Sequence, residues 1–139
     1  MAAAWPVAAQ SVIDGDTIEL GGRAYRLHGV DAPELGQICA DGWPAGTEAE
    51  EYLDELVAGK RVVCVPTVGG GDGEKVAICR ADGVDLGSAM VTVGYALAQV
   101  PHSARYISEE ASATKAHRGL HAHPCLAPWK WRTRIQQEG

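Results

Sequence analysis

Residues 10–20 read Gln-Ser-Val-Ile-Asp-Gly-Asp-Thr-Ile-Glu-Leu, and this stretch decides how the fold begins. Asp-Gly between two β-branched runs is a strong signal for a β-hairpin. We therefore predict strands at 10–13 and 17–20, joined by the turn at 14–16. Gly21-Gly22 makes the next turn and a third strand follows at 24–30. The first thirty residues are expected to form an antiparallel meander.

The remainder of the chain predicts further short strands and three helices. Thr47 with Glu50 three residues later is a capping-box pattern, which predicts a helix at 47–57. Strands are expected at 61–66 and 75–80. Asp85 can cap a second helix that runs to Val93. A third helix, opened by Ser103 or Ser108, is expected to end near residue 118.

This order of elements is an α+β pattern, and short strands joined by tight turns favour a small barrel. We predict a five-stranded OB-fold β-barrel with three α-helices, because that fold places a helix between its third and fourth strands. The 139 residues are expected to form a single domain, 1–139. We interpret residues 1–8 as a stub left after removal of a signal peptide, and residues 124–139 as a C-terminal tail.

The charge of the chain is unevenly distributed. The formal net charge is −6, which is unusual for a protein that binds nucleic acid. Residues 1–99 carry six basic and fifteen acidic side chains, whereas residues 100–139 carry six and three. The C-terminal part could therefore meet a polyanion, or it could simply be a basic tail beside a solvated acidic face. No apolar run is long enough to cross a membrane.

Four cysteines in a chain this short indicate two disulfides and an oxidising compartment, so we expect a secreted or periplasmic protein. Cys64 and Cys79 end two strands that should be neighbours, which predicts a cross-strand disulfide. Cys39 and Cys125 lie in a loop and in the tail. They either pair with each other or remain free thiols.

Four carboxylates, those of Asp14, Asp16, Asp31 and Glu34, lie around the first hairpin and the end of the third strand. In a meander, Asp16 and Asp31 can approach each other, and clustered oxygens of this kind suit a hard cation such as calcium. Arg26 lies five residues before Asp31. A guanidinium beside a metal site is expected where an anion such as a phosphodiester bridges the two. Taken alone, these residues also fit an ordinary turn and an ordinary strand end.

An ordered series of motifs along the chain is more specific than any one of them. Val-Ile-Asp-Gly-Asp-Thr-Ile at 12–18 is followed by Tyr-Arg-Leu-His-Gly-Val-Asp-Ala-Pro-Glu at 25–34. Further matching stretches lie at 46–56, 85–96 and 106–120, and the tail adds Pro128, Trp131 and Arg132. Together they resemble the staphylococcal nuclease family over nearly the whole chain.

The resemblance implies a calcium-dependent nuclease that hydrolyses phosphodiester bonds of DNA or RNA. Separately, we expect a monomer with nucleic acid as its substrate and no membrane partner. Asp16 and Asp31 would coordinate Ca²⁺ by carboxylate, and Ala32 by its backbone carbonyl. Glu34 would position or deprotonate the attacking water. Arg26 would bind the phosphate and neutralise its developing charge.

One position departs from the family pattern. The family places a second catalytic arginine where this chain has Glu74, and Lys75 is the nearest replacement. A shift by one residue along a strand turns a side chain to the opposite face. The chain is therefore either a nuclease, weakened by this loss, or a catalytically inactive OB-fold binding module.

Several other side chains have both a functional and a structural interpretation. His121, His123 and Cys125 could be read as a zinc site, although their spacing fits no common zinc pattern. His28 is expected to be a packed neutral histidine. Three tryptophans, Trp43, Trp129 and Trp131, could stack on bases, but packing is the commoner role.

Overall fold

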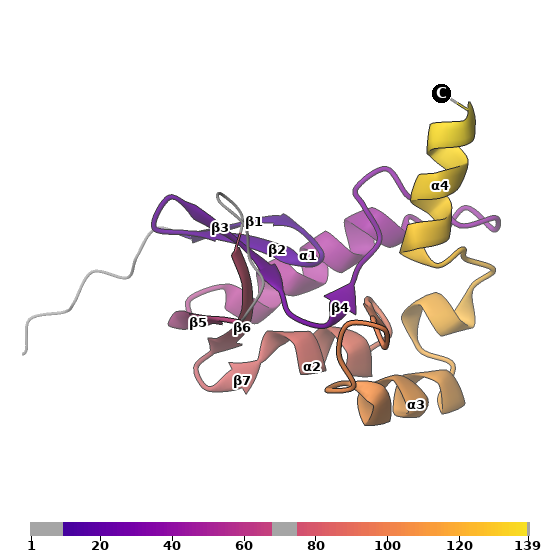
Figure 1. Cartoon of the computed structure of the whole chain (residues 1–139). Coiled ribbons are helices and arrows are strands. Elements are labelled where there is room, and N and C mark those ends of the chain that lie inside the picture. Colours follow the sequence, from indigo (N-terminus) through magenta and orange to yellow (C-terminus); the bar gives the residue numbers. More distant parts are fainter. Residues whose placement is uncertain (1–9, 68–74, 139) are drawn as a thin grey trace, which may run out of the picture.

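The computed structural model describes residues 10–67 and 75–138, and Figure 1 shows a twisted sheet with helices packed beside it. The first three strands are β1 (Gln10–Asp14), β2 (Thr17–Leu20) and β3 (Arg23–Leu27). They pair antiparallel in sequence order, so the predicted meander is confirmed. The register places Arg26 opposite Thr17, next to Asp16.

The remaining strands extend this sheet in the order β1-β2-β3-β6-β5. β6 (Lys75–Ala81) pairs parallel with β3 and antiparallel with β5 (Val62–Pro66) and β7 (Val84–Asp85). The predicted α+β class is confirmed, and the arrangement is consistent with a partly open OB-fold. Among the described residues no ladder joins β1 to β5, so the barrel is not closed there.

The predicted third strand at 24–30 is interrupted. β3 ends at Leu27, and Gly29 adopts a φ of 72°, in the left-handed region that glycine tolerates best. The chain then resumes as β4 (Val30–Asp31), which pairs with β8 (Leu97–Ala98) in a small second sheet. This break gives Asp31 a buried position beside the main sheet.

The first helix begins earlier than the capping-box pattern predicted. α1 (Ala45–Val57) has Pro44 at its N-cap with no side-chain cap, and Thr47 is an exposed residue of the first turn. The predicted capping box at Thr47 is therefore wrong. Apolar residues of α1 pack against the sheet, and Leu53 is fully buried.

The other helices follow the predictions in part. Asp85 caps α2 (Leu86–Thr92) as predicted, because its carboxylate accepts the Ser88 N–H at 3.1 Å. α3 (Ile107–Lys115) begins after Tyr106, so neither predicted serine cap is used.

The described part of the chain has one more helix than the three α-helices that were predicted. A short 3₁₀ turn, η1 (Gly119–Ala122), leads towards this fourth helix, α4 (Pro128–Glu138). None of the helices in residues 10–67 and 75–138 is long and apolar enough to span a bilayer.

Both disulfides are formed. Cys64 and Cys79 face each other directly in the β5–β6 ladder, which confirms the predicted cross-strand bridge. Cys39 and Cys125 also pair, which resolves the alternative that the sequence left open.

Candidate functional site

A polar pocket of about 280 Å³ lies where the β1–β2 turn, β3, β4 and α4 meet. Its lining contains all four side chains to which the resemblance assigned a role: Asp16, Arg26, Asp31 and Glu34. Asp14, Thr17 and Arg132 complete the lining. The local hairpin and the break after β3 thus bring together residues that are separated by fewer than twenty positions in the sequence.

Asp16 is buried under the first hairpin turn and is held by two hydrogen bonds. One carboxylate oxygen accepts the Thr17 hydroxyl at 3.0 Å, and the other accepts the backbone N–H of Ala32 at 2.9 Å. Burial, followed by the nearby charge of Asp14, raises the pKa of Asp16 to about 7. The Asp16 carboxylate is thus held in position by hydrogen bonds, while burial and the neighbouring acid disfavour its charged form.

Asp31, at the end of β4, is completely buried and contacts two arginines. Arg132 donates from Nη1 to Oδ1 at 3.1 Å and from Nη2 to Oδ2, the bidentate geometry that a guanidinium fork favours. Arg26 Nη2 lies 3.5 Å from the same Oδ1. A buried carboxylate is costly unless it is paired, and here two guanidinium groups meet that need.

Glu34 is more open than the aspartates, with 48% of its side chain exposed. One carboxylate oxygen lies 3.6 Å from Arg132 Nη1, so Arg132 contacts two acidic side chains of the pocket. The Glu34 carbonyl accepts the N–H of Gln37 at 2.8 Å, which fixes the loop on which Glu34 lies. The side chain can therefore reach solvent while its backbone is held.

Arg132 is the site residue to which the sequence assigned no role. It lies on α4, four residues after the fully buried Pro128, so both residues face inward on one side of the helix. The hydrogen bonds that Arg132 donates to Asp31 raise the pKa of Arg132 further, so the group remains charged. Two signals in the sequence pointed to this end of the chain, the excess of basic residues after position 100 and the tail motif that contains Arg132, but neither gave it a role.

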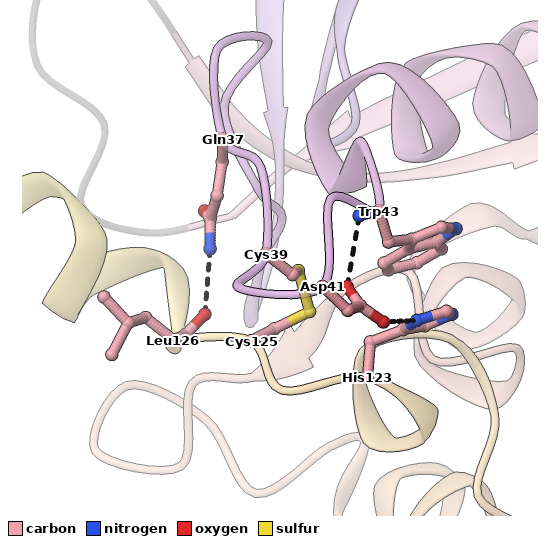
Figure 2. Close-up of a disulfide and its surroundings, with 7 residues drawn as sticks. All are labelled: Gln37, Cys39, Asp41, Trp43, His123, Cys125 and Leu126. Atoms are coloured by element: carbon pink, nitrogen blue, oxygen red, sulfur yellow. Dashed lines mark hydrogen bonds and ion pairs between the residues drawn. A yellow bond between two sulfur atoms is a disulfide. The ribbon is translucent and has the colours of Figure 1, made fainter.

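The start of α4 is fastened to the loop that follows Asp31 (Figure 2). The Cys39–Cys125 disulfide joins the two segments covalently. The buried side chain of Gln37 donates to the Leu126 carbonyl at 2.8 Å, and the Ala40 N–H donates to the Pro124 carbonyl at 3.1 Å. This fastening sets the position of α4, and with it the position of the arginine in the pocket.

The zinc interpretation is wrong, because two of its three residues have other partners. Cys125 is in a disulfide, and His123 Nδ1 lies 2.7 Å from a carboxylate oxygen of Asp41. The His123 ring also stacks on Trp43 (Figure 2), and the two ring centroids are 4.2 Å apart. Trp43 thus packs against the protein's own His123 ring, which is the structural role considered for it.

The two other tryptophans that could stack on bases, Trp129 and Trp131, differ in their exposure to solvent. Trp131 lies over Gly36, and its side chain is partly buried, whereas Trp129 is 41% exposed.

The ring nitrogens of His28 lie within hydrogen-bond distance of the Thr67 and Ser103 hydroxyls. His28 is therefore hydrogen-bonded and partly buried, which agrees with the packed position that was expected.

The family model described as "Staphylococcal nuclease homologue" matches residues 24–123. The chain belongs to the staphylococcal nuclease family. It is also similar to the "Succinoglycan biosynthesis protein ExoI" of Rhizobium meliloti (strain 1021), with 34% identity over 137 residues, which is 90% of this chain and 72% of that protein. Asp16 and Arg132 both lie outside the segment that the family model matches.

In this staphylococcal nuclease-family chain, the donors of the pocket suit a hard divalent cation in chemistry and in charge. Four carboxylates and two guanidinium groups leave an excess of negative charge, and all the acidic donors are oxygens. Among residues 10–67 and 75–138, however, no three metal-ligating side chains converge closely enough to hold an ion as they stand. A cation on Asp31 would have to share that carboxylate with Arg132.

The position where the family has its second arginine, Glu74, lies outside the described residues. Its neighbour Lys75 is described, and the structure places it away from the pocket. In the parallel β3–β6 ladder, Lys75 pairs with Tyr25, and Arg26 pairs with Val76. Because side chains alternate along a strand, Lys75 lies on the face opposite Arg26, and it is absent from the lining of the pocket.

Proposed function

We propose that the chain is a calcium-dependent phosphodiesterase that hydrolyses phosphodiester bonds of DNA or RNA. The observation that supports this proposal best is the convergence of Asp16, Arg26, Asp31 and Glu34 on one polar pocket. Two opposite requirements are met there: acidic oxygens for a cation, and a guanidinium for a phosphate. The membership of the staphylococcal nuclease family supports the same chemistry.

Each side chain has a role in this proposal. A calcium ion held by Asp16, Asp31 and the Ala32 carbonyl would polarise the phosphate and stabilise negative charge on its oxygens. Glu34, the most exposed of these acids, accepts the proton of the attacking water. Arg26 binds the phosphate and stabilises the charge that develops on it.

The two disulfides support an oxidising location, and we propose that the protein acts in the periplasm or outside the cell, as a monomer. Nucleic acid is its proposed substrate. The net negative charge of the chain would slow the approach of a polyanion, while the basic residues after position 100 would favour it locally.

The test is digestion of plasmid DNA and of RNA with Ca²⁺ present, repeated with a chelator. We expect cleavage that the chelator abolishes and that Glu34→Gln reduces by at least 10²-fold, on the order of what a catalytic base contributes. Glu51→Gln, which changes an exposed glutamate of α1, is the matched control and should cut at the wild-type rate. A wild type that cuts neither substrate under any calcium condition would overturn the proposal.

The second candidate is an inactive OB-fold binding module. The net charge of −6 favours it, and so do the hydrogen bonds that Arg132 donates to both carboxylate oxygens of Asp31, because a cation would have to compete for these oxygens. The relative from Rhizobium is named for succinoglycan biosynthesis and not for nucleic-acid cleavage. Binding of a labelled oligonucleotide without any cleavage would favour this module over the nuclease.

A further inference from the structure

We propose that Arg132 is a catalytic residue that supplies the second guanidinium group for the scissile phosphate, from the C-terminal helix and beside Arg26. The inference rests on the proposed phosphodiesterase function and deepens it. The arginine lies outside the segment matched by the family model. Its part in the site comes from tertiary contacts alone.

The two guanidinium groups meet at a single atom. Arg132 Nη1 lies 3.1 Å and Arg26 Nη2 lies 3.5 Å from Oδ1 of Asp31. Groups that both contact one carboxylate oxygen lie close enough together for one phosphate to contact both. Carboxylate and phosphate oxygens are also the two partners that a guanidinium fork matches.

Both arginines line the pocket while they contact the buried carboxylate. Each is about one-third exposed, at 32% for Arg26 and 31% for Arg132, whereas Asp31 beneath them is fully buried. The arginines therefore lie between the buried acid and the solvent from which a phosphodiester arrives. A bound phosphate can accept hydrogen bonds from their outer N–H groups.

A second guanidinium beside Arg26 would stabilise the negative charge that the chemistry builds up. The water oxygen attacks phosphorus, Glu34 takes the water proton, the bond from phosphorus to the leaving ester oxygen breaks, and that oxygen takes a proton from solvent. Negative charge builds up on the non-bridging oxygens during this exchange, and preorganised cations stabilise it. Arg132 keeps its own protons throughout and acts only by charge and hydrogen bonds.

Other candidates for this role are less suitable. Lys75 lies on the opposite face of β6 from Val76, which pairs with Arg26. Lys130 and Arg134 flank Arg132 on α4 but do not line the pocket. Arg132 is the cation that α4 turns inward, on the same side as the buried Pro128.

The position of Arg132 is also rigidly supported, as catalytic positioning requires. α4 begins three residues after Cys125, which is tied to Cys39, and Trp131 covers Gly36 two residues from Glu34. An arginine that only neutralised a buried acid would not need to reach Glu34 as well, yet its Nη1 lies 3.6 Å from that carboxylate.

The first test is kinetic. With plasmid DNA and Ca²⁺, Arg132→Ala should lower kcat by about 10²–10³-fold, the loss typical of one preorganised charge contact. Arg132→Lys should recover part of the rate, because it keeps the charge and loses the fork. Arg134→Ala removes an equal charge from the exposed side of the same helix and should keep the wild-type rate. Thermal melting should show all three variants folded.

The second test measures binding without cleavage. In a Glu34→Gln background with Ca²⁺, the affinity for fluorescent pentathymidylate is measured over a series of salt concentrations. Loss of one phosphate contact reduces the slope of log K against log[salt] by about 0.7 for a single strand. We expect this change with Arg132→Ala and not with Arg134→Ala.

The outcomes separate this inference from the proposed function. A wild type that cuts DNA, combined with an Arg132→Ala variant that cuts equally fast or keeps the full salt slope, would overturn the role of Arg132 and leave the nuclease intact. Equal changes in slope for Arg132→Ala and Arg134→Ala would also overturn it, because they would show only a general charge effect. A wild type that does not cut at all would instead contradict the proposed function.

Discussion

Gly46, in the first turn of α1, packs directly against the carbonyl oxygen of Glu34. A Cβ at position 46 would lie 1.8 Å from that oxygen and 2.8 Å from the Leu35 Cα, far inside normal contact. The Gly46 N–H also donates to the Gln37 carbonyl at 3.1 Å. The start of the helix and the loop that carries the proposed base are therefore one packed unit.

Gly46→Ala should destabilise the fold and displace Glu34. The added methyl group forces the loop away from α1, and such overpacking typically costs about 1–3 kcal/mol. Without a clash, the same change inside a helix would be favourable by up to about 1 kcal/mol. Urea denaturation measures whether the free energy of unfolding falls or rises in the variant, and plasmid cleavage measures the effect on the site.

Gly36→Ala is the matched control for this prediction. It lies in the same loop, and its Cβ would meet Trp131 at an ordinary 3.8 Å. It should change stability by less than Gly46→Ala and keep activity. A stabilised and fully active Gly46→Ala would show that the loop does not depend on this contact.

Calcium should bind with a measurable heat that depends on Asp16 and Asp31. We expect a weak dissociation constant, on the order of 10⁻⁴–10⁻³ M, since few charged ligands are secured. The double variant Asp16→Asn, Asp31→Asn should give no heat in isothermal titration calorimetry. Asp54→Asn, on the exposed side of α1, should bind as the wild type does. Equal heats from all three proteins would refute a site at these residues.

Removal of the Cys39–Cys125 disulfide should impair both stability and activity. It links positions 86 residues apart, and loss of a crosslink over a loop of that length costs about 4–5 kcal/mol in the chain-entropy account. The double variant Cys39→Ser, Cys125→Ser should also free the start of α4 and lower kcat through Arg132. Guanidinium denaturation and cleavage assays measure the two effects.

The second disulfide provides the control for this experiment. Cys64→Ser, Cys79→Ser opens a link of only 15 residues, for which the expected loss is about 3 kcal/mol. Because this bridge is remote from α4, kcat should change little at temperatures where both variants are folded. A larger loss of kcat in this control would argue against a role for the α4 anchor.

Glu74→Arg should raise the rate of cleavage. Position 74 lies outside the described residues, so this prediction follows from the family pattern and from charge: it removes an acid and adds a phosphate-binding group. A gain of up to about 10²-fold is in the range of one such contact. The gain should be larger in an Arg132→Ala background, where the second guanidinium is missing.

Glu74→Gln separates the two contributions, because it removes the acid without adding a cation. A partial gain in Glu74→Gln would indicate that repulsion by Glu74 limits the wild type. No gain in either variant, with the fold intact by circular dichroism, would show that position 74 does not act on the phosphate.

The sequence alone determined the features that depend on short separations. The Asp-Gly turn predicted the first hairpin, and the antiparallel meander places Arg26 beside Asp16, because it folds a short stretch of chain onto itself. Asp31 and Glu34 follow within the same short stretch, although the break after β3 that places them was not predicted. The Asp85 cap was predicted for the same reason, since its hydrogen bond to Ser88 spans three residues. The cross-strand disulfide followed from strand order.

Only the tertiary structure decided the features that join distant segments. Thr47 has a good local capping pattern, but close packing of Gly46 on the Glu34 loop starts the helix earlier. Cys39 and Cys125 had no local signal that paired them. Arg132 lies 101 residues after Asp31, and the tail motif that contains it does not say that its side chain will reach a buried carboxylate. That contact is set by the disulfide and the packing of α4, which bring the end of the chain to the pocket built by its beginning.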